Sequence, residues 1–72
     1  MNERILGVMR NVLQTENIDE NTNQCNCEKW DSLHHLNLIV ELEDEFDVEF
    51  EPEEIAEMKS FDAVKRMLES KL

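Results

Sequence analysis

The sequence predicts one all-α domain, a small four-helix bundle with a long loop after the first helix and a short third helix. Its 72 residues suit one domain, so residues 1–72 are expected to form a single unit. Hydrophobic residues make up 40% of the chain, which is enough for a compact core. Only one Gly and one Pro are present and β-branched residues are few, which favours helices joined by polar loops over a sheet.

The N-terminal segment, residues 2–14, has the apolar spacing of a helix, with Asn2 as its expected N-cap. Its apolar positions are Ile5, Val8, Met9, Val12 and Leu13. Residues 15–30 are polar and rich in Asn, without a helical or strand period. We expect a loop here, anchored to the core by Ile18, and loops of this length are often functional or locally ordered.

A second helix is expected from Ser32 to Phe46, and it has two apolar stripes where a small bundle needs one. The stripe assigned to the core comprises His35, Leu38, Ile39, Leu42 and Phe46. The second stripe comprises Leu33, Leu36 and Val40, and it is bordered by Asn37, Glu41 and Asp44. For Leu33 and Val40 we expect an exposed contact patch rimmed by carboxylates, because the other helices already fill one core. Leu36 could belong to this patch or pack under the long loop.

Two further helices complete the domain. Pro52 suits the first turn of a short helix that continues over residues 53–59, in which Ile55 and Met58 face inward. Ser60 is the expected cap of the last helix. The apolar side of that helix comprises Phe61, Val64, Met67, Leu68 and Leu72.

The chain is strongly acidic, with 18 acidic and 7 basic residues and a formal net charge of −11 at pH 7. Such a chain repels nucleic-acid phosphates and anionic membrane surfaces, and it attracts basic protein surfaces. No apolar run is long enough to span a bilayer and no signal peptide is recognised, so we expect a cytoplasmic monomer without membrane insertion. Cys25 and Cys27 are too close in sequence for an unstrained bridge, and free thiols are expected.

Asp31 and Ser32 stand at the start of the second helix, where either side chain can serve as the N-cap. A serine hydroxyl at this position also lies beside free backbone N–H groups and the positive end of the helix dipole, which stabilise a phosphate. Catalysis by Ser32 is not expected, because the side chains of His34 and His35 point elsewhere and no Gly-rich nucleophile elbow surrounds the serine. The sequence thus predicts a site for a phosphate-linked modification, and no enzyme.

The motif Asp31-Ser32-Leu33 at the start of the second helix resembles the attachment motif of acyl carrier proteins and related peptidyl carrier domains. The resemblance continues through residues 38–46 into the acidic turn and the third helix, and it covers essentially the whole chain. It implies that Ser32 receives 4'-phosphopantetheine from coenzyme A, added by a separate phosphopantetheinyl transferase that uses Mg²⁺. The thiol of this arm would hold an acyl or aminoacyl group as a thioester for delivery to other enzymes.

The resemblance also implies roles for the residues around Ser32. Asp31 and Leu33 flank the attachment site within the motif. The positions that match the partner-facing side of the family's second helix are Leu33, Leu36 and Val40, and the positions that match acidic partner contacts include Asp31, Glu41 and Asp44. The implied partners are the transferase, an acyl-loading ligase, and acyl-transferring or condensing enzymes with basic docking surfaces. Phe50 matches a position that lines the acyl pocket, and it could equally be a core residue.

Three residues depart from the pattern of fatty-acid carriers. Those carriers typically have a small residue in place of Trp30, an acid in place of His34 and often an acid in place of Asn37. The pattern looks more like stand-alone carriers of specialised pathways or peptidyl-type carriers, which leaves the cargo and the pathway open. His34 is either a solvated histidine or one that titrates with a bound phosphodiester, whereas His35 is expected to pack or to hydrogen-bond at the edge of the core.

Metal binding finds little support in the sequence. The residues that could hold zinc lack the spacing of a structural zinc site; they are Cys25, Cys27, His34 and His35. Asp19, Asn21 and Asn23 imitate the first half of an EF-hand loop, but Gln24 stands at the position of the required Gly and Trp30 at that of the bidentate Glu.

The main alternative to a carrier is a small acidic adaptor that binds partners through its helical surface without modification. This hypothesis explains the charge and the second apolar stripe, and it makes Ser32 only a helix cap.

Overall fold

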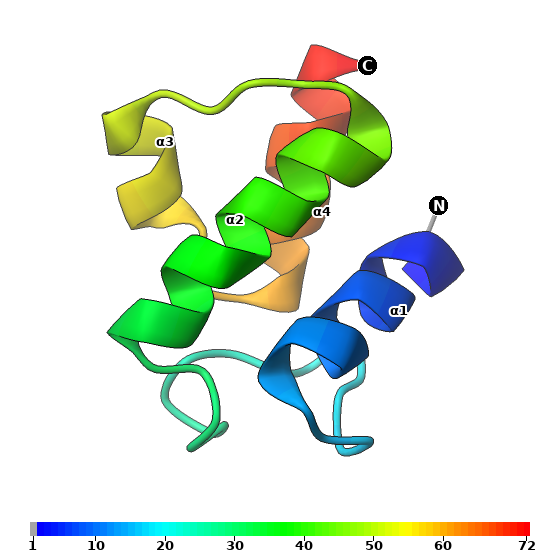
Figure 1. Cartoon of the computed structure of the whole chain (residues 1–72), viewed down its shortest axis with the longest axis vertical. Helices are drawn as coiled ribbons and strands as arrows, with labels where there is room; N and C mark the ends of the chain where they lie inside the picture. Colours follow the sequence, from blue (N-terminus) through cyan, green and yellow to red (C-terminus); the bar gives the residue numbers. More distant parts are fainter. Residues whose placement is uncertain (1) are drawn as a thin grey trace.

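The computed structural model describes residues 2–72, and over this range the chain forms four helices and no strand. The helices are α1 (Asn2–Leu13), α2 (Ser32–Phe46), α3 (Pro52–Glu57) and α4 (Phe61–Lys71). In Figure 1 α2 crosses the middle of the molecule between α1 and α3, and α4 lies behind it. The expected all-α, four-helix architecture is confirmed, including the long first loop and the short third helix. Of the helices described, none is long and apolar enough to cross a membrane.

The first helix differs from the expectation at both ends. Asn2 is the first helical residue and not the cap, and its side-chain amide donates a hydrogen bond to Glu20 of the following loop. The helix ends at Leu13 because Gln14 adopts the left-handed conformation with φ of 55°. Leu6, which the expected apolar face omitted, is buried.

The long loop between α1 and α2 is held against the start of α4, along the lower edge of Figure 1. The backbone N–H of Phe61 donates to the Thr22 carbonyl at 2.9 Å, and that of Gln24 donates to the Lys59 carbonyl at 2.9 Å. Ile18 is buried and anchors the loop, as expected. These contacts give the Asn-rich segment a defined path to the start of α2.

One hydrophobic core takes side chains from all the elements except α3, whose Ile55 packs at its edge. The buried residues are Ile5, Leu6, Met9, Leu13, Ile18, Trp30, Leu38, Ile39, Leu42, Phe46, Phe50, Met58, Phe61, Val64 and Leu68. Leu72 was expected on the apolar side of the last helix, and this was wrong: its side chain is 64% exposed because α4 ends at Lys71.

The turn between α2 and α3 is organised by carboxylates. Asp47 closes α2 in the left-handed conformation with φ of 55°, and a Glu43 oxygen then accepts the backbone N–H of Phe50 at 2.9 Å. At the start of α3, the backbone N–H of Glu51 donates to Glu54 at 2.7 Å. Lys71 forms an ion pair with Glu54 at 2.9 Å, which ties the end of α4 to α3.

Candidate functional site

Asp31 is the N-cap of α2. Its backbone is extended, and its Oδ1 accepts a hydrogen bond from the backbone N–H of His34 at 2.9 Å. The same oxygen lies 2.8 Å from Nδ1 of the His34 ring. Both hydrogen bonds lower the pKa of Asp31 below its usual value. The bond from the backbone N–H contributes most, and the bond from the ring contributes next. Asp31 is therefore an ionised cap that is bonded to His34.

Ser32 is the first residue of α2, and it is exposed. Because the Asp31 side chain makes the cap bond, the serine hydroxyl is not needed for it. The first turn of α2 contains no acidic residue, and the N-terminal end of the helix carries the partial positive charge of its N–H groups. The hydroxyl is thus presented where a phosphodiester would be favoured.

Trp30 and His35 form a hydrogen-bonded pair beside this site. The Trp30 side chain is buried, at 3% exposure, and its Nε1 donates to Nδ1 of His35 at 2.9 Å. The other ring nitrogen of His35, Nε2, lies 2.9 Å from the backbone oxygen of Ile55 in α3. The expected hydrogen-bonding role of His35 is therefore observed, but the part of Trp30 in it could not be read from the sequence.

The second apolar stripe of α2 is exposed to solvent. The exposed fractions are 65% for Leu33, 58% for Leu36 and 61% for Val40. Leu36 therefore does not pack under the long loop. Glu41 and Asp44, the acidic residues expected to border the stripe, are exposed as well. We call Leu33, Leu36 and Val40 the apolar strip, and its role in partner binding remains a prediction.

Negative charge is concentrated from the C-terminal half of α2 to α3. Ten of the seventeen residues from 41 to 57 are Asp or Glu, and none is Lys or Arg. Two of these carboxylates form ion pairs with other helices: Glu45 with Arg4 of α1 at 3.1 Å, and Glu54 with Lys71 of α4 at 2.9 Å. Arg4 also lies over the Phe46 ring. The other eight carboxylates form no ion pair within the described residues, and they give α2 and α3 a surface suited to basic partners.

Phe50 and the cysteines complete the residues singled out by sequence. Phe50 packs in the core at 8% exposure. Cys25 is exposed, Cys27 is half-buried, and both are free in the described part of the chain. Between residues 2 and 72, no three His, Cys, Asp or Glu side chains gather closely enough to hold a metal ion.

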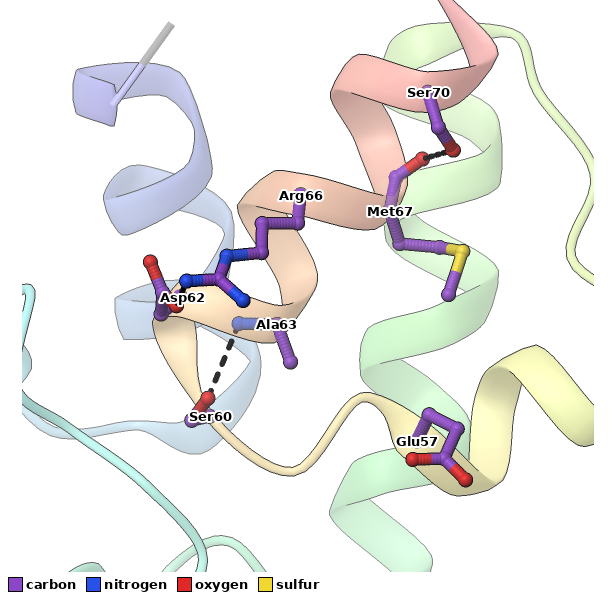
Figure 2. Close-up of a pocket in the computed structure, with 7 residues that line it drawn as sticks. All are labelled: Glu57, Ser60, Asp62, Ala63, Arg66, Met67 and Ser70. Carbon is purple, nitrogen blue, oxygen red and sulfur yellow. Dashed lines mark hydrogen bonds and ion pairs between the residues drawn. The ribbon is translucent and has the colours of Figure 1, made fainter.

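A pocket of about 480 Å³ lies along α4, and Figure 2 shows that most of its polar side chains already form hydrogen bonds or ion pairs with one another or with the backbone. The Ser60 hydroxyl accepts the backbone N–H of Ala63 at 3.1 Å, and Arg66 pairs with Asp62 at 3.0 Å. The lining residues come from the end of α3, the segment after it and α4; they are Glu57, Ser60, Asp62, Ala63, Arg66, Met67 and Ser70. None of them comes from α2 or from the loop before Ser32, so the pocket is not part of the Ser32 site.

Comparison with known proteins shows a similarity in structure. No family model matches the chain, and no curated protein matches it. Its structure is similar to that of a candidate acyl carrier protein from Mycobacterium tuberculosis, with a TM-score of 0.85 and 28% sequence identity. The match covers 96% of this chain and 95% of the other. The resemblance to the acyl carrier protein family that residues 31–33 indicated is thereby confirmed, and the fold is that of this family.

Proposed function

We propose that this acyl-carrier-like domain carries acyl or aminoacyl groups as thioesters on a 4'-phosphopantetheine arm bound to Ser32. The observation that carries the proposal is the exposed Ser32 as the first residue of α2, directly after the capping Asp31. In this fold, that placement gives an enzyme access to a serine whose hydroxyl the helix cap does not use. The chain acts as a carrier and leaves catalysis to its partners.

The residues around Ser32 fit a phosphate-linked arm. Asp31 satisfies the N–H of His34, while the helix end beside Ser32 remains favourable for an anion. The Asp31 carboxylate is held by His34 and so does not need to turn toward the phosphate. When bound, the arm supplies a terminal thiol that holds the cargo as a thioester.

The attachment step needs little from this chain beyond the hydroxyl. The Ser32 oxygen loses its proton to a base of the transferase and forms a bond to a phosphorus of the coenzyme A diphosphate. The P–O–P linkage breaks, and adenosine 3',5'-bisphosphate leaves. This chain orients the nucleophile through the rigid start of α2, and the transferase with its Mg²⁺ provides the charge stabilisation.

The apolar strip and the acidic surface support a common docking face for partners. Leu33 adjoins Ser32, while Glu41 and Asp44 lie further along the same helix, so an enzyme that reaches Ser32 meets apolar and acidic groups together. Such a surface suits a basic patch with an apolar centre, as proposed for the transferase, a loading ligase and acyl-transferring or condensing enzymes. The cargo and the pathway stay open, and a cytoplasmic location stays a prediction.

The experiment that tests the proposal measures intact mass. The protein is incubated with coenzyme A, Mg²⁺ and a promiscuous phosphopantetheinyl transferase, and we expect a gain of one phosphopantetheinyl group. Ser32→Ala should abolish the gain, whereas Ser70→Ala, at an exposed serine of α4, should keep it. No gain on the wild-type chain, with a known carrier modified in parallel, would favour the unmodified acidic adaptor instead.

A further inference from the structure

A chain of two hydrogen bonds connects the loop before Ser32 with α3 through His35. Trp30 Nε1 lies 2.9 Å from His35 Nδ1, and His35 Nε2 lies 2.9 Å from the Ile55 oxygen. An indole N–H can only donate and a carbonyl can only accept, so one form of His35 satisfies both bonds: the neutral ring protonated at Nε2. We call Trp30, His35 and the Ile55 carbonyl the relay.

The far end of the relay stabilises α3. Ile55 lies in the last turn of this six-residue helix, where backbone carbonyls lack intrahelical partners. Its oxygen accepts the backbone N–H of Met58 at 3.2 Å and also the ring of His35. Since so short a helix has little stability of its own, the ring of His35 fixes where α3 lies against α2.

The Trp30 end of the relay holds the backbone that leads into Ser32. Trp30 precedes the cap residue Asp31, and the backbone N–H of His35 donates to the Asp31 carbonyl at 2.8 Å. His35 therefore bonds to both residues that precede Ser32: to Trp30 through its ring and to Asp31 through its backbone. Loss of the ring bond would leave the buried indole N–H without its partner, and this would strain the backbone that leads into the cap.

We propose that His35 is a positioning residue for the modification of Ser32, acting through the buried indole of Trp30. The inference rests on the proposed function and deepens it, because it names what holds the attachment motif in a reactive geometry. His35 does not touch the reacting atoms in this account. It restricts the orientations of the Ser32 hydroxyl, which matters because small misplacements of a nucleophile lower the rate of group transfer strongly.

The test compares His35→Phe, which keeps a planar ring and removes both hydrogen bonds, with His35→Gln, whose amide can accept and donate. With each chain in turn as the carrier substrate of the transferase, we expect kcat/KM for His35→Phe to be about tenfold below that for the wild type. The loss should fall on kcat, while KM for the carrier stays near the wild-type value because the apolar strip is unchanged. His35→Gln should recover a substantial part of kcat.

Two further variants guard against a purely structural effect. Trp30→Phe removes the donor at the other end of the relay and should reproduce the loss in kcat even if His35→Phe folds poorly. Met67→Ala shortens a half-buried side chain of α4 outside the relay, and it should lower stability without lowering kcat. A kcat that followed stability across all variants, or a His35→Gln variant as slow as His35→Phe, would overturn the positioning role.

Failure of this inference can be told apart from failure of the proposed function. A wild-type chain that is never modified rejects the function and the positioning role together. A wild-type chain that is modified at the same kcat as His35→Phe and Trp30→Phe rejects the relay alone. Fluorescence of Trp30, the only tryptophan, reports whether each His35 variant has released the indole from its buried site.

Discussion

One oxygen of Asp31 accepts hydrogen bonds from two groups of His34, its backbone N–H at 2.9 Å and its ring Nδ1 at 2.8 Å. The arrangement makes His34 the partner of the cap and not a free solvated side chain. It also leaves Nε2 as the ring nitrogen that does not face Asp31. His34, one of the three residues that depart from the pattern of fatty-acid carriers, thus supports the attachment motif from inside the same helical turn.

The hydrogen bonds to the Asp31 carboxylate make the stability of the fold depend on pH. Because hydrogen bonds from His34 lower the pKa of Asp31 in the folded state below its usual value of 3.8, the folded chain gains stability from the ionised carboxylate. That gain is fully present above pH 3.8 and is lost as the pH falls through the lower folded pKa. Asp31→Asn should therefore be less stable than the wild type at neutral pH, and the difference should shrink below pH 3.8.

Urea unfolding at a series of pH values measures this difference. Glu69→Gln, at an exposed carboxylate of α4, controls for the loss of one negative charge. An Asp31→Asn difference that stayed constant into strong acid would show that the ionised cap contributes nothing to stability.

Ser32→Ala should leave the fold nearly as stable as the wild type. The cap bond belongs to Asp31, and Ser32 is exposed as the first helical residue. We expect its free energy of unfolding to change by no more than about 0.5 kcal/mol, as at other exposed positions. Chemical denaturation checks this, and a larger loss would mean that the hydroxyl has a structural role and that Ser32→Ala is not a clean test of attachment.

Two leucines of α2 should respond in opposite ways. Leu38 is fully buried, so Leu38→Ala should cost about 2–5 kcal/mol of unfolding free energy. Leu36 belongs to the exposed apolar strip, and Leu36→Ser should cost no more than about 0.5 kcal/mol. With the transferase, Leu36→Ser should raise KM for the carrier, since it removes apolar contact area from the proposed docking face. Unchanged KM in that variant would exclude Leu36 from the interface.

Gln14 offers a stabilising substitution. Its φ of 55° is a left-handed conformation that costs little for Gly and more for any residue with a Cβ. Gln14→Gly should raise the free energy of unfolding by about 0.5–1 kcal/mol, while Asn11→Gly, within α1, should lower it by a similar amount. Thermal unfolding of both variants measures this: the midpoint should rise for Gln14→Gly and fall for Asn11→Gly. A fall in both would show that the left-handed backbone at residue 14 carries no cost.

The acidic stretch from 41 to 57 predicts a response to salt. With a net charge of −11, the folded chain repels itself, and added salt screens this repulsion. The midpoint of thermal unfolding should therefore rise between low and moderate concentrations of NaCl. A midpoint that did not change would mean that pairs such as Arg4–Glu45 already offset the repulsion.

Much of the fold could be read from local patterns. The bounds of α2, the cap function at Ser60 and the exposure of Leu33 and Val40 follow from helical periodicity and capping chemistry, which depend on neighbours within a few residues. The same logic failed at the chain ends. Asn2 is inside α1, and Leu72 lies beyond the last turn of α4, because periodicity does not show where a helix begins or stops.

What the sequence by itself determined is a helical domain with a serine at the start of α2 and more apolar surface than one core can bury. Only the tertiary structure decided that Trp30 is buried, that His35 receives its indole N–H and that Ile55 accepts from the same ring. The carbonyl of Ile55 is twenty residues away from His35, and every residue has such a carbonyl, so no sequence pattern marks it. The choice was made by the packing of α3 against α2, which brings this carbonyl to the ring while the long loop turns the indole inward.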